Sequence, residues 1–461
     1  MSKSTAWFSQ AAAVLIISLL SACPETSLPL QPSTENPTQT GTETTATHLA
    51  SLVELSELDN SRYAATAIDA AGTIHALFTE LPSGGKSTLF YRASADGGNT
   101  WSENLNLSQD DRSHAVGVPH LAVDGQGRVY AVWKIMEESD TQDSIRGGAY
   151  GAPLVYRVLE NGRWSAAQRI DSKGLVRSWF LAVDPTGQAH AVWVENGVAS
   201  DGYKTIAAAR FAQAELTGTS IGAERELYAP GPSNPADPGY IWRLPNYGGL
   251  RGYVDAQGKA HWTAYKIPTD QSEDESVIVH WDGAQERELK SYVNYASFVG
   301  PYYNPPELLL DDQGREHILL QDVKAPRQTL RDLQPDGSFE TVYATSPQSE
   351  IRSFQVVHGP AGEAAALMTI KDASADNPAF GLYVSRLQNG TWSAPVDLTD
   401  NAVRILRQAD STAADGMRFF EPFYASGAFD AQGRLNLVMV ANEVGINRVP
   451  YYTPKVFFGR L

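Results

Sequence analysis

Arginine and aromatic residues gather in the connections that join one predicted pair of strands to the next. A planar guanidinium forms paired hydrogen bonds with a carboxylate or a sulfate, and an aromatic ring packs on the apolar face of a sugar. Together these residue types predict a site for an anionic or hydroxyl-rich ligand. The candidates of the two types are Arg62, Trp179, Arg251, Tyr303, Arg352 and Arg418.

Most of the notable histidines share one position in a repeat. Four of them follow the glycine of a predicted turn by three residues, which indicates a structural position, because metal ligands have to converge on one point. His114 and His120 fall outside this pattern. No metal, nucleotide or phosphate-loop motif is recognisable, so we expect neither a metal nor another cofactor. The four patterned residues are His75, His190, His261 and His317.

The N-terminus has the pattern of a bacterial secretion signal. Lys3 supplies a positive charge, and Ala11–Leu20 form a largely apolar run of ten residues. The run is too short to span a bilayer, which takes about 20 residues. It ends in Leu20-Ser21-Ala22-Cys23, which resembles the lipobox of bacterial lipoproteins. The resemblance implies removal of residues 1–22 and acylation of Cys23, which would anchor the exported chain in the cell envelope, at the outer membrane if the bacterium is Gram-negative.

The mature chain divides into a tether and one folded domain. Residues 23–47 are rich in Thr, Pro, Ser and Glu and lack aromatic residues, so they bury too little surface to fold. Residues 48–461 contain the regular patterning. Across all 461 residues, 42% are apolar and the net charge is −17. This acidity argues against a nucleic-acid partner, which requires a basic surface, and the single cysteine excludes an intramolecular disulfide. We expect a monomer.

One motif, Asp-x-x-Gly between two apolar strands, recurs along the folded domain. Successive copies start 47 to 72 residues apart, and a degraded copy begins at His358. Each copy predicts a tight hairpin in which the aspartate binds the local backbone and the glycine takes a positive φ. These aspartates are therefore structural. They are Asp69, Asp124, Asp184, Asp255, Asp311 and Asp430.

A second predicted hairpin lies between successive copies and ends near a tryptophan, as at Trp101, Trp164 and Trp392. Two hairpins per repeat give four strands, which is the blade of a β-propeller. The sequence therefore predicts an all-β, seven-bladed propeller, or a six-bladed one if the degraded copy forms no blade. The segment Ala50–Leu55 resembles the outer strands. We expect it to complete the last blade and close the ring.

The segment Ser94–Trp101 matches the Asp-box, Ser-x-Asp-x-Gly-x-Thr-Trp, of the sialidase (BNR-repeat) superfamily. The first repeat resembles the first blade of bacterial exo-sialidases, in which an arginine precedes the turn glycine by ten residues. Arg62 stands ten residues before Gly72, although the Ile-Pro that follows this arginine in the family is absent. The resemblance implies that Arg62 is the first arginine of a triad that binds the substrate carboxylate.

The general acid/base of that family is an aspartate followed by proline, six residues before the aspartate of the second turn. Here Val118 and Pro119 occupy these positions, and valine transfers no proton. Asp111, His114 and His120 come from the same connection and are the candidates to replace the missing aspartate.

The nucleophile of the family is a tyrosine nine residues before the glycine of a late turn, and a glutamate from a middle blade activates it. Tyr424 is nine residues before Gly433, with Glu421 close by in sequence. The matching middle-blade position is Gly249, which departs from the family. The topology makes Arg251, Arg352 and Arg418 the candidates for the other two arginines of the triad.

Three functions remain open. A sialidase-like propeller that lacks the aspartate and the middle-blade glutamate fits a protein that binds carbohydrate, in particular an acidic glycan, without catalysis. The second function is an exo-sialidase-type hydrolase of terminal acidic sugars, with Arg62 as clamp and Tyr424 as nucleophile. The third is a propeller-type polysaccharide lyase, in which Arg62 neutralises a uronate carboxylate and Tyr424, with His114 or His120, removes the adjacent proton.

Overall fold

The structure is a computed structural model of the whole chain, and its described residues all lie within Ala46–Leu461. The described residues are 49, 52–57, 60–81, 87–108, 113–137, 153–171, 176–198, 206–229, 246–267, 277–289, 304–322, 327–334, 337–359, 362–372, 379–399, 418–445 and 454–461. The predicted signal, Cys23 and the tether lie outside them. Within these ranges, no helix is long and apolar enough to cross a membrane.

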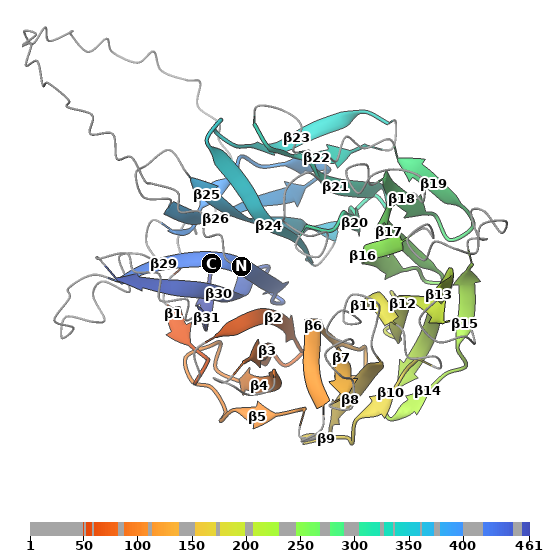
Figure 1. Cartoon of the computed structure of the whole chain (residues 1–461). Coiled ribbons are helices and arrows are strands. Elements are labelled where there is room, and N and C mark those ends of the chain that lie inside the picture. Colours follow the sequence, from red (N-terminus) through yellow and green to blue (C-terminus); the bar gives the residue numbers. More distant parts are fainter. Residues whose placement is uncertain are drawn as a thin grey trace, which may run out of the picture. The chain divides into compact units, whose positions relative to one another are not determined.

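The described strands form seven antiparallel sheets, which we number as blades 1 to 7 (Figure 1). Blade 1 contains β2 (Ser61–Ile68), β3 (Ile74–Glu80), β4 (Thr88–Ser94) and β5 (Leu105–Asn106). Blade 2 contains β6 (Ser113–Val123), β7 (Val129–Glu137), β8 (Leu154–Glu160), β9 (Arg163–Trp164) and β10 (Gln168–Arg169). Blade 3 contains β11 (Val176–Val183), β12 (Ala189–Val198), β13 (Ile206–Thr217), β14 (Ser220–Ile221) and β15 (Arg225–Tyr228). Blade 4 contains β16 (Asn246–Val254), β17 (Ala260–Ile267), β18 (Val277–Trp281) and β19 (Glu286–Leu289).

The remaining blades follow the same order. Blade 5 contains β20 (Glu307–Leu310), β21 (Glu316–Asp322), β22 (Thr329–Leu333) and β23 (Phe339–Ala344). Blade 6 contains β24 (Ser349–His358), β25 (Ala364–Asp372), β26 (Ala379–Gln388), β27 (Thr391–Trp392) and β28 (Val396–Asp397). Blade 7 contains β29 (Arg418–Phe429), β30 (Leu435–Gly445), β31 (Pro454–Arg460) and β1 (Leu52–Glu54). The first strands β2, β6, β11, β16, β20, β24 and β29 each contact the first strands of both neighbouring blades, so the seven blades close into a ring.

The ring closes as the sequence predicts, with an N-terminal strand in the last blade. Strand β1 pairs with β31, where Leu52 lies opposite Gly459. Beyond the strand, the Leu55 N–H donates to the Val456 carbonyl at 2.8 Å, and the Val456 N–H donates to Ser56 Oγ at 2.9 Å. The pairing satisfies the backbone of what would otherwise be an exposed edge strand.

The Asp-x-x-Gly motifs are hairpin turns between the first and second strands of a blade. In blade 1, Asp69 Oδ1 accepts hydrogen bonds from the N–H groups of Ala71 and Thr73, and Gly72 has a φ of 82°. The degraded copy lacks the aspartate but keeps Gly362 at a φ of 76° between β24 and β25. That copy therefore forms a blade, which settles the number of blades at seven.

The patterned histidines pack on their own turns, and a patterned tryptophan packs against the neighbouring blade. His190 lies 2.9 Å from its turn aspartate Asp184, and His75, His261 and His317 contact their own turn aspartates in the same way. The Trp164 ring packs edge-on against Tyr91 of the preceding blade, with ring centroids 4.9 Å apart. Both residue types thus stabilise the fold, as their spacing in the sequence indicates.

Candidate functional site

Four polar side chains from the first strands of four blades form what we call the central cluster. It consists of His120 on β6, Arg251 on β16, Glu307 on β20 and Tyr424 on β29. Arg251 Nε donates to Glu307 Oε1 at 3.2 Å, and Arg251 Nη1 donates to the Leu250 carbonyl at 2.9 Å. The two paired side chains are 16% and 7% exposed, so this ion pair is largely withdrawn from water.

The charge on Arg251 reaches every other member of the cluster. Burial raises the pKa of Glu307 to about 7, although Arg251 opposes the rise. Burial also raises the pKa of Tyr424 to about 12, where Arg251 lowers it and Glu307 raises it. Burial and the positive charge of Arg251 lower the pKa of His120 to about 3. Arg251 is therefore close enough to each of the other three groups to shift its pKa.

These pKa values define which chemistry the cluster can perform at neutral pH. Glu307 both accepts and donates a proton there, because its pKa lies close to the ambient pH. Tyr424 keeps its proton, and His120 stays a neutral imidazole. Arg251 provides a positive charge that can bind a ligand carboxylate. Such binding requires that the hydrogen bond from Arg251 Nε to Glu307 weakens or breaks.

The three clustered residues on β6, β16 and β20 occupy one repeat position. His120, Arg251 and Glu307 each precede their turn glycine by seven residues, whereas Tyr424 precedes Gly433 by nine. Near this point six of the seven first strands have a register shift against the second strand, for example between Gly248 and Arg251. Such bulges redirect side chains and are frequent beside binding sites.

Trp179 lies beside the cluster but is not open to a ligand. Its side chain is only 5% exposed, and its ring packs edge-on against His120 with centroids 5.7 Å apart. Lys134 Nζ lies 5.2 Å from the Trp179 ring centroid and donates to the Arg177 carbonyl at 3.3 Å. Burial and the charge of Arg177 lower the pKa of Lys134 to about 8. Trp179 therefore packs against His120 and Lys134.

The remaining described candidates surround the cluster. Arg62, near the start of β2, has an exposed side chain, and the adjacent Tyr63 packs edge-on against Tyr424 with centroids 6.1 Å apart. Arg352 forms an ion pair of 2.6 Å with Glu350 and is 32% exposed. The structure thus brings Arg251, His120 and Tyr424 together. Arg62 on β2 and Arg352 on β24 each lie on a first strand that contacts β29, the strand of Tyr424.

For five other candidates the structure describes either nothing or only the backbone. Asp111 and Tyr303 are not among the described residues. His114 belongs to β6, and Arg418 and Glu421 belong to β29, but only their backbones are described. Their predicted roles stay predictions.

Glu307 and Lys134 are the residues to which the sequence assigned no role. The search for a middle-blade glutamate nine residues before a turn glycine found Gly249, whereas Glu307 stands seven residues before Gly314. A search for polar residues seven residues before a turn glycine, the position of His120 and Arg251, would have identified Glu307. Among the described residues, no group of three or more His, Cys, Asp or Glu side chains could hold a metal ion.

Comparison with known proteins finds similarity to solved structures alone. No family model matches it, and no curated protein matches it. A solved structure of unknown function from Dyadobacter fermentans has a TM-score of 0.45 and 12% identity over 90% of this chain and 98% of its own. The Hadza microbial sialidase has a TM-score of 0.43 and 9% identity over 87% of this chain and 65% of its own. The α-L-arabinanase of Penicillium chrysogenum, solved with arabinobiose, has a TM-score of 0.42 and 10% identity over 90% of this chain and 98% of its own.

Proposed function

We propose that this chain is a lipid-anchored protein of the bacterial cell envelope whose propeller binds an acidic carbohydrate at the central cluster. The observation that carries the proposal is Arg251, which is 16% exposed, pairs with Glu307 and acts electrostatically on Tyr424 and His120. A ligand carboxylate that enters this cluster meets a guanidinium, a carboxyl group that can be protonated, and a phenol that can donate. Each of these groups hydrogen-bonds an anion or a sugar hydroxyl.

The charge around the cluster favours an anion. The protein as a whole carries −17, yet the described side chains of the seven first strands include four arginines and only two glutamates. They are Arg62, Arg177, Arg251 and Arg352, against Glu307 and Glu350. A local excess of positive charge within an acidic protein attracts an acidic ligand to this end of the strands.

Proton uptake should accompany binding of such an anion. A ligand carboxylate competes with ionised Glu307 for Arg251, whereas protonated Glu307 leaves the guanidinium available and donates a hydrogen bond itself. Since the pKa of Glu307 is about 7, we expect affinity to increase as the pH falls from 8 to 6. A neutral glycan of the same size should show no such dependence.

A second candidate function is hydrolysis with Tyr424 as nucleophile. It is favoured by Glu307, whose charge affects the pKa of Tyr424 and whose own pKa suits a base at neutral pH. Besides Glu307, the central cluster lacks an acid for the leaving group, because Val118 stands where the family has its aspartate and His120 is not protonated near neutrality. We therefore expect any hydrolysis to be confined to aryl glycosides, whose leaving groups need no proton.

The decisive experiment compares binding and turnover on the same preparation. The full chain in detergent is applied to an array of sialylated, uronate-containing and neutral glycans, and it is incubated with an aryl sialoside and with uronate polysaccharides. Binding of acidic glycans without release of the aryl group or of unsaturated ends supports the binding function. Release of the aryl group supports the second candidate, and absorbance from unsaturated ends would replace both with a lyase.

Two variants locate the site and the anchor. Arg251→Gln should abolish binding of acidic glycans, whereas the control Arg287→Gln, an exposed arginine on β19 paired with Asp282, should bind like wild type. Equal loss in both variants would remove Arg251 from the site. Cys23→Ala should move the protein from the membrane fraction to the soluble fraction, and unchanged membrane association would contradict the lipid anchor.

A further inference from the structure

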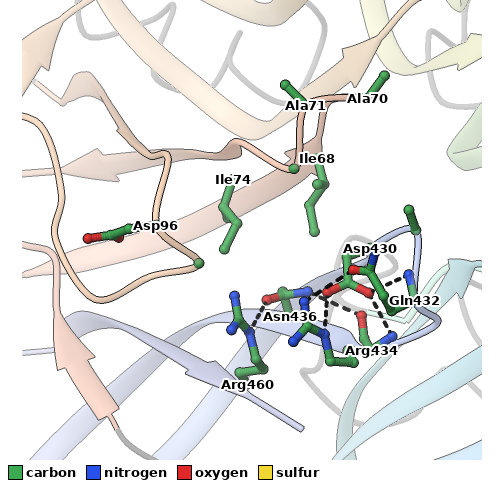
Figure 2. Close-up of a pocket in the computed structure, with 13 residues that line it drawn as sticks. Ile68, Ala70, Ala71, Ile74, Asp96, Asp430, Gln432, Arg434, Asn436 and Arg460 are labelled. Atoms are coloured by element: carbon green, nitrogen blue, oxygen red, sulfur yellow. Dashed lines mark hydrogen bonds and ion pairs between the residues drawn. The ribbon is translucent and has the colours of Figure 1, made fainter.

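A hollow lies at the opposite end of the strands from the central cluster, between blade 1 and blade 7. It has a volume of about 320 Å³. One wall comes from Ile68 and Ile74 with the adjoining turn, and the other comes from Arg434, Asn436 and Arg460 (Figure 2). Strand β2 begins beside Tyr424 and ends at Ile68, so the hollow and the central cluster are separate places on the same strand.

The carboxylates on the rim of the hollow are already hydrogen-bonded within their own turns. Asp430 Oδ2 accepts from Arg434 Nε at 2.7 Å, and its Oδ1 accepts two backbone N–H groups. Asp96 accepts from the Thr100 N–H at 2.9 Å, from Thr100 Oγ1 at 2.6 Å and from Ser94 Oγ at 2.8 Å. Both carboxylates are therefore held in place by groups of their own turns, and Arg434 lies against the charge of Asp430.

Arg460 is different, because its position is fixed while the outer part of its guanidinium has no partner among the described residues. Its Nε donates to Asn436 Oδ1 at 2.9 Å, and Asn436 is fully buried. On the other side the guanidinium lies against Gly97, where an added Cβ would stand 2.2 Å from Nη2. The asparagine and the glycine thus orient Arg460, and both Nη groups keep donors for a ligand.

The opposite wall is apolar. Ile68 is half-buried and Ala71 is exposed, and Figure 2 shows both across the hollow from Arg434 and Arg460, with Ile74 buried behind them at 1% exposure. An occupant that satisfies both walls has a carboxylate on one side and a compact apolar body on the other. Two Nη donors of one guanidinium match the two oxygens of a carboxylate.

We propose that this hollow is a binding site for a small carboxylic acid with a compact apolar body. The carboxylate accepts hydrogen bonds from Arg460 Nη1 and Nη2, and the body packs on Ile68 and Ala71. The site is independent of the carbohydrate site, because none of its residues belongs to the central cluster.

The test uses benzoate as the probe and benzamide as its neutral counterpart. Binding to the full chain in detergent is measured by ligand-observed NMR, with wild type, Arg460→Gln, Arg251→Gln and Arg287→Gln compared at equal protein concentration. We expect benzoate to bind wild type about tenfold or more tightly than benzamide, because a charge-assisted fork is lost in the amide. Arg460→Gln should lose this preference, whereas the other two variants should keep it.

Three results would overturn the proposal. They are no benzoate binding to wild type, equal binding of benzamide, and loss of benzoate binding in Arg251→Gln instead of Arg460→Gln, which would place the probe in the central cluster. Glycan binding by Arg460→Gln and its thermal unfolding are measured in parallel. An unchanged unfolding temperature shows that the variant is folded, and unchanged glycan binding keeps this test separate from that of the proposed function.

Discussion

Replacing Glu307 with glutamine should change how the stability of the protein depends on pH. Glu307 is 7% exposed and paired with Arg251, and its pKa of about 7 lies above the ordinary value of 4.5. A raised pKa in the folded state means that folding favours the protonated carboxyl. As the pH rises above 4.5, the unfolded chain releases this proton first. The free energy of unfolding should therefore decrease between pH 4.5 and pH 7.

The size of this change follows from the pKa shift. The two pKa values differ by about 2.5 (7 minus 4.5). One pKa unit corresponds to about 1.4 kcal/mol, so ionisation of Glu307 should lower the free energy of unfolding by about 3 kcal/mol. Glutamine has nearly the same shape and no titration, so the variant should lack this contribution. Relative to wild type, Glu307→Gln should become more stable by about 3 kcal/mol on going from pH 4.5 to pH 8.

Urea unfolding of both proteins at intervals between pH 4.5 and 8 measures this difference. Comparing variant with wild type cancels the titration of all other groups, provided that they are unaffected by the substitution. Thr263→Val is a non-titrating control nearby, because Thr263 is fully buried and its Oγ1 donates to the Pro306 carbonyl at 2.8 Å. A constant difference between Glu307→Gln and wild type, as expected for the threonine variant, would refute the burial of a titrating carboxyl in the cluster.

Three further predictions concern the cluster, a blade interface and the ring closure. The pKa of His120 is about 3, so the large NMR shift changes that accompany imidazole protonation should be absent between pH 8 and pH 5, both in wild type and in Glu307→Gln. Arg251→Gln should raise this pKa, and protonation of His120 in Glu307→Gln with a midpoint near 6.5 would contradict the burial of the imidazole. Trp392 Nε1 donates to the fully buried Asp332 at 2.9 Å, so Trp392→Phe should lower the free energy of unfolding in urea by about 1–3 kcal/mol. Leu55 is also fully buried, so Leu55→Ala should lower the free energy of unfolding in urea by about 2–5 kcal/mol. An unchanged free energy of unfolding would contradict the place of Leu55 in the closed ring.

The sequence predicts the fold because each turn is determined locally. Asp69 and Gly72 form their hairpin from contacts within four residues, and the same arrangement is repeated around the ring. Such a repeat is visible in one sequence as a fixed spacing. The contact between Trp164 and Tyr91 crosses from one blade to the next, and the spacing predicts this contact as well because every blade packs on its neighbours in the same way.

The candidate site is predicted less well because it depends on distances across the ring. Spacing places Tyr424 and Arg251 on first strands, but it gives no sign that Glu307 pairs with Arg251. Trp179 has the residue type of a sugar-stacking platform, yet it is buried beneath His120 and Lys134. The pKa of Glu307 comes mainly from burial, and the degree of burial depends on how the strands of several blades pack.

The proton balance of the cluster favours binding over hydrolysis. A tyrosine nucleophile needs a base, and a poor leaving group needs an acid in the same step. Glu307 is the one described group of the cluster with a pKa near neutrality. It serves as a base only when ionised and as an acid only when protonated, so it does not perform both tasks at once. Because Val118 provides no proton and His120 is not protonated at neutral pH, we expect a natural glycoside at the proposed site to keep its leaving group. If Val118→Asp gave the protein activity on alkyl glycosides, the missing acid would be identified as the step that separates this propeller from a hydrolase.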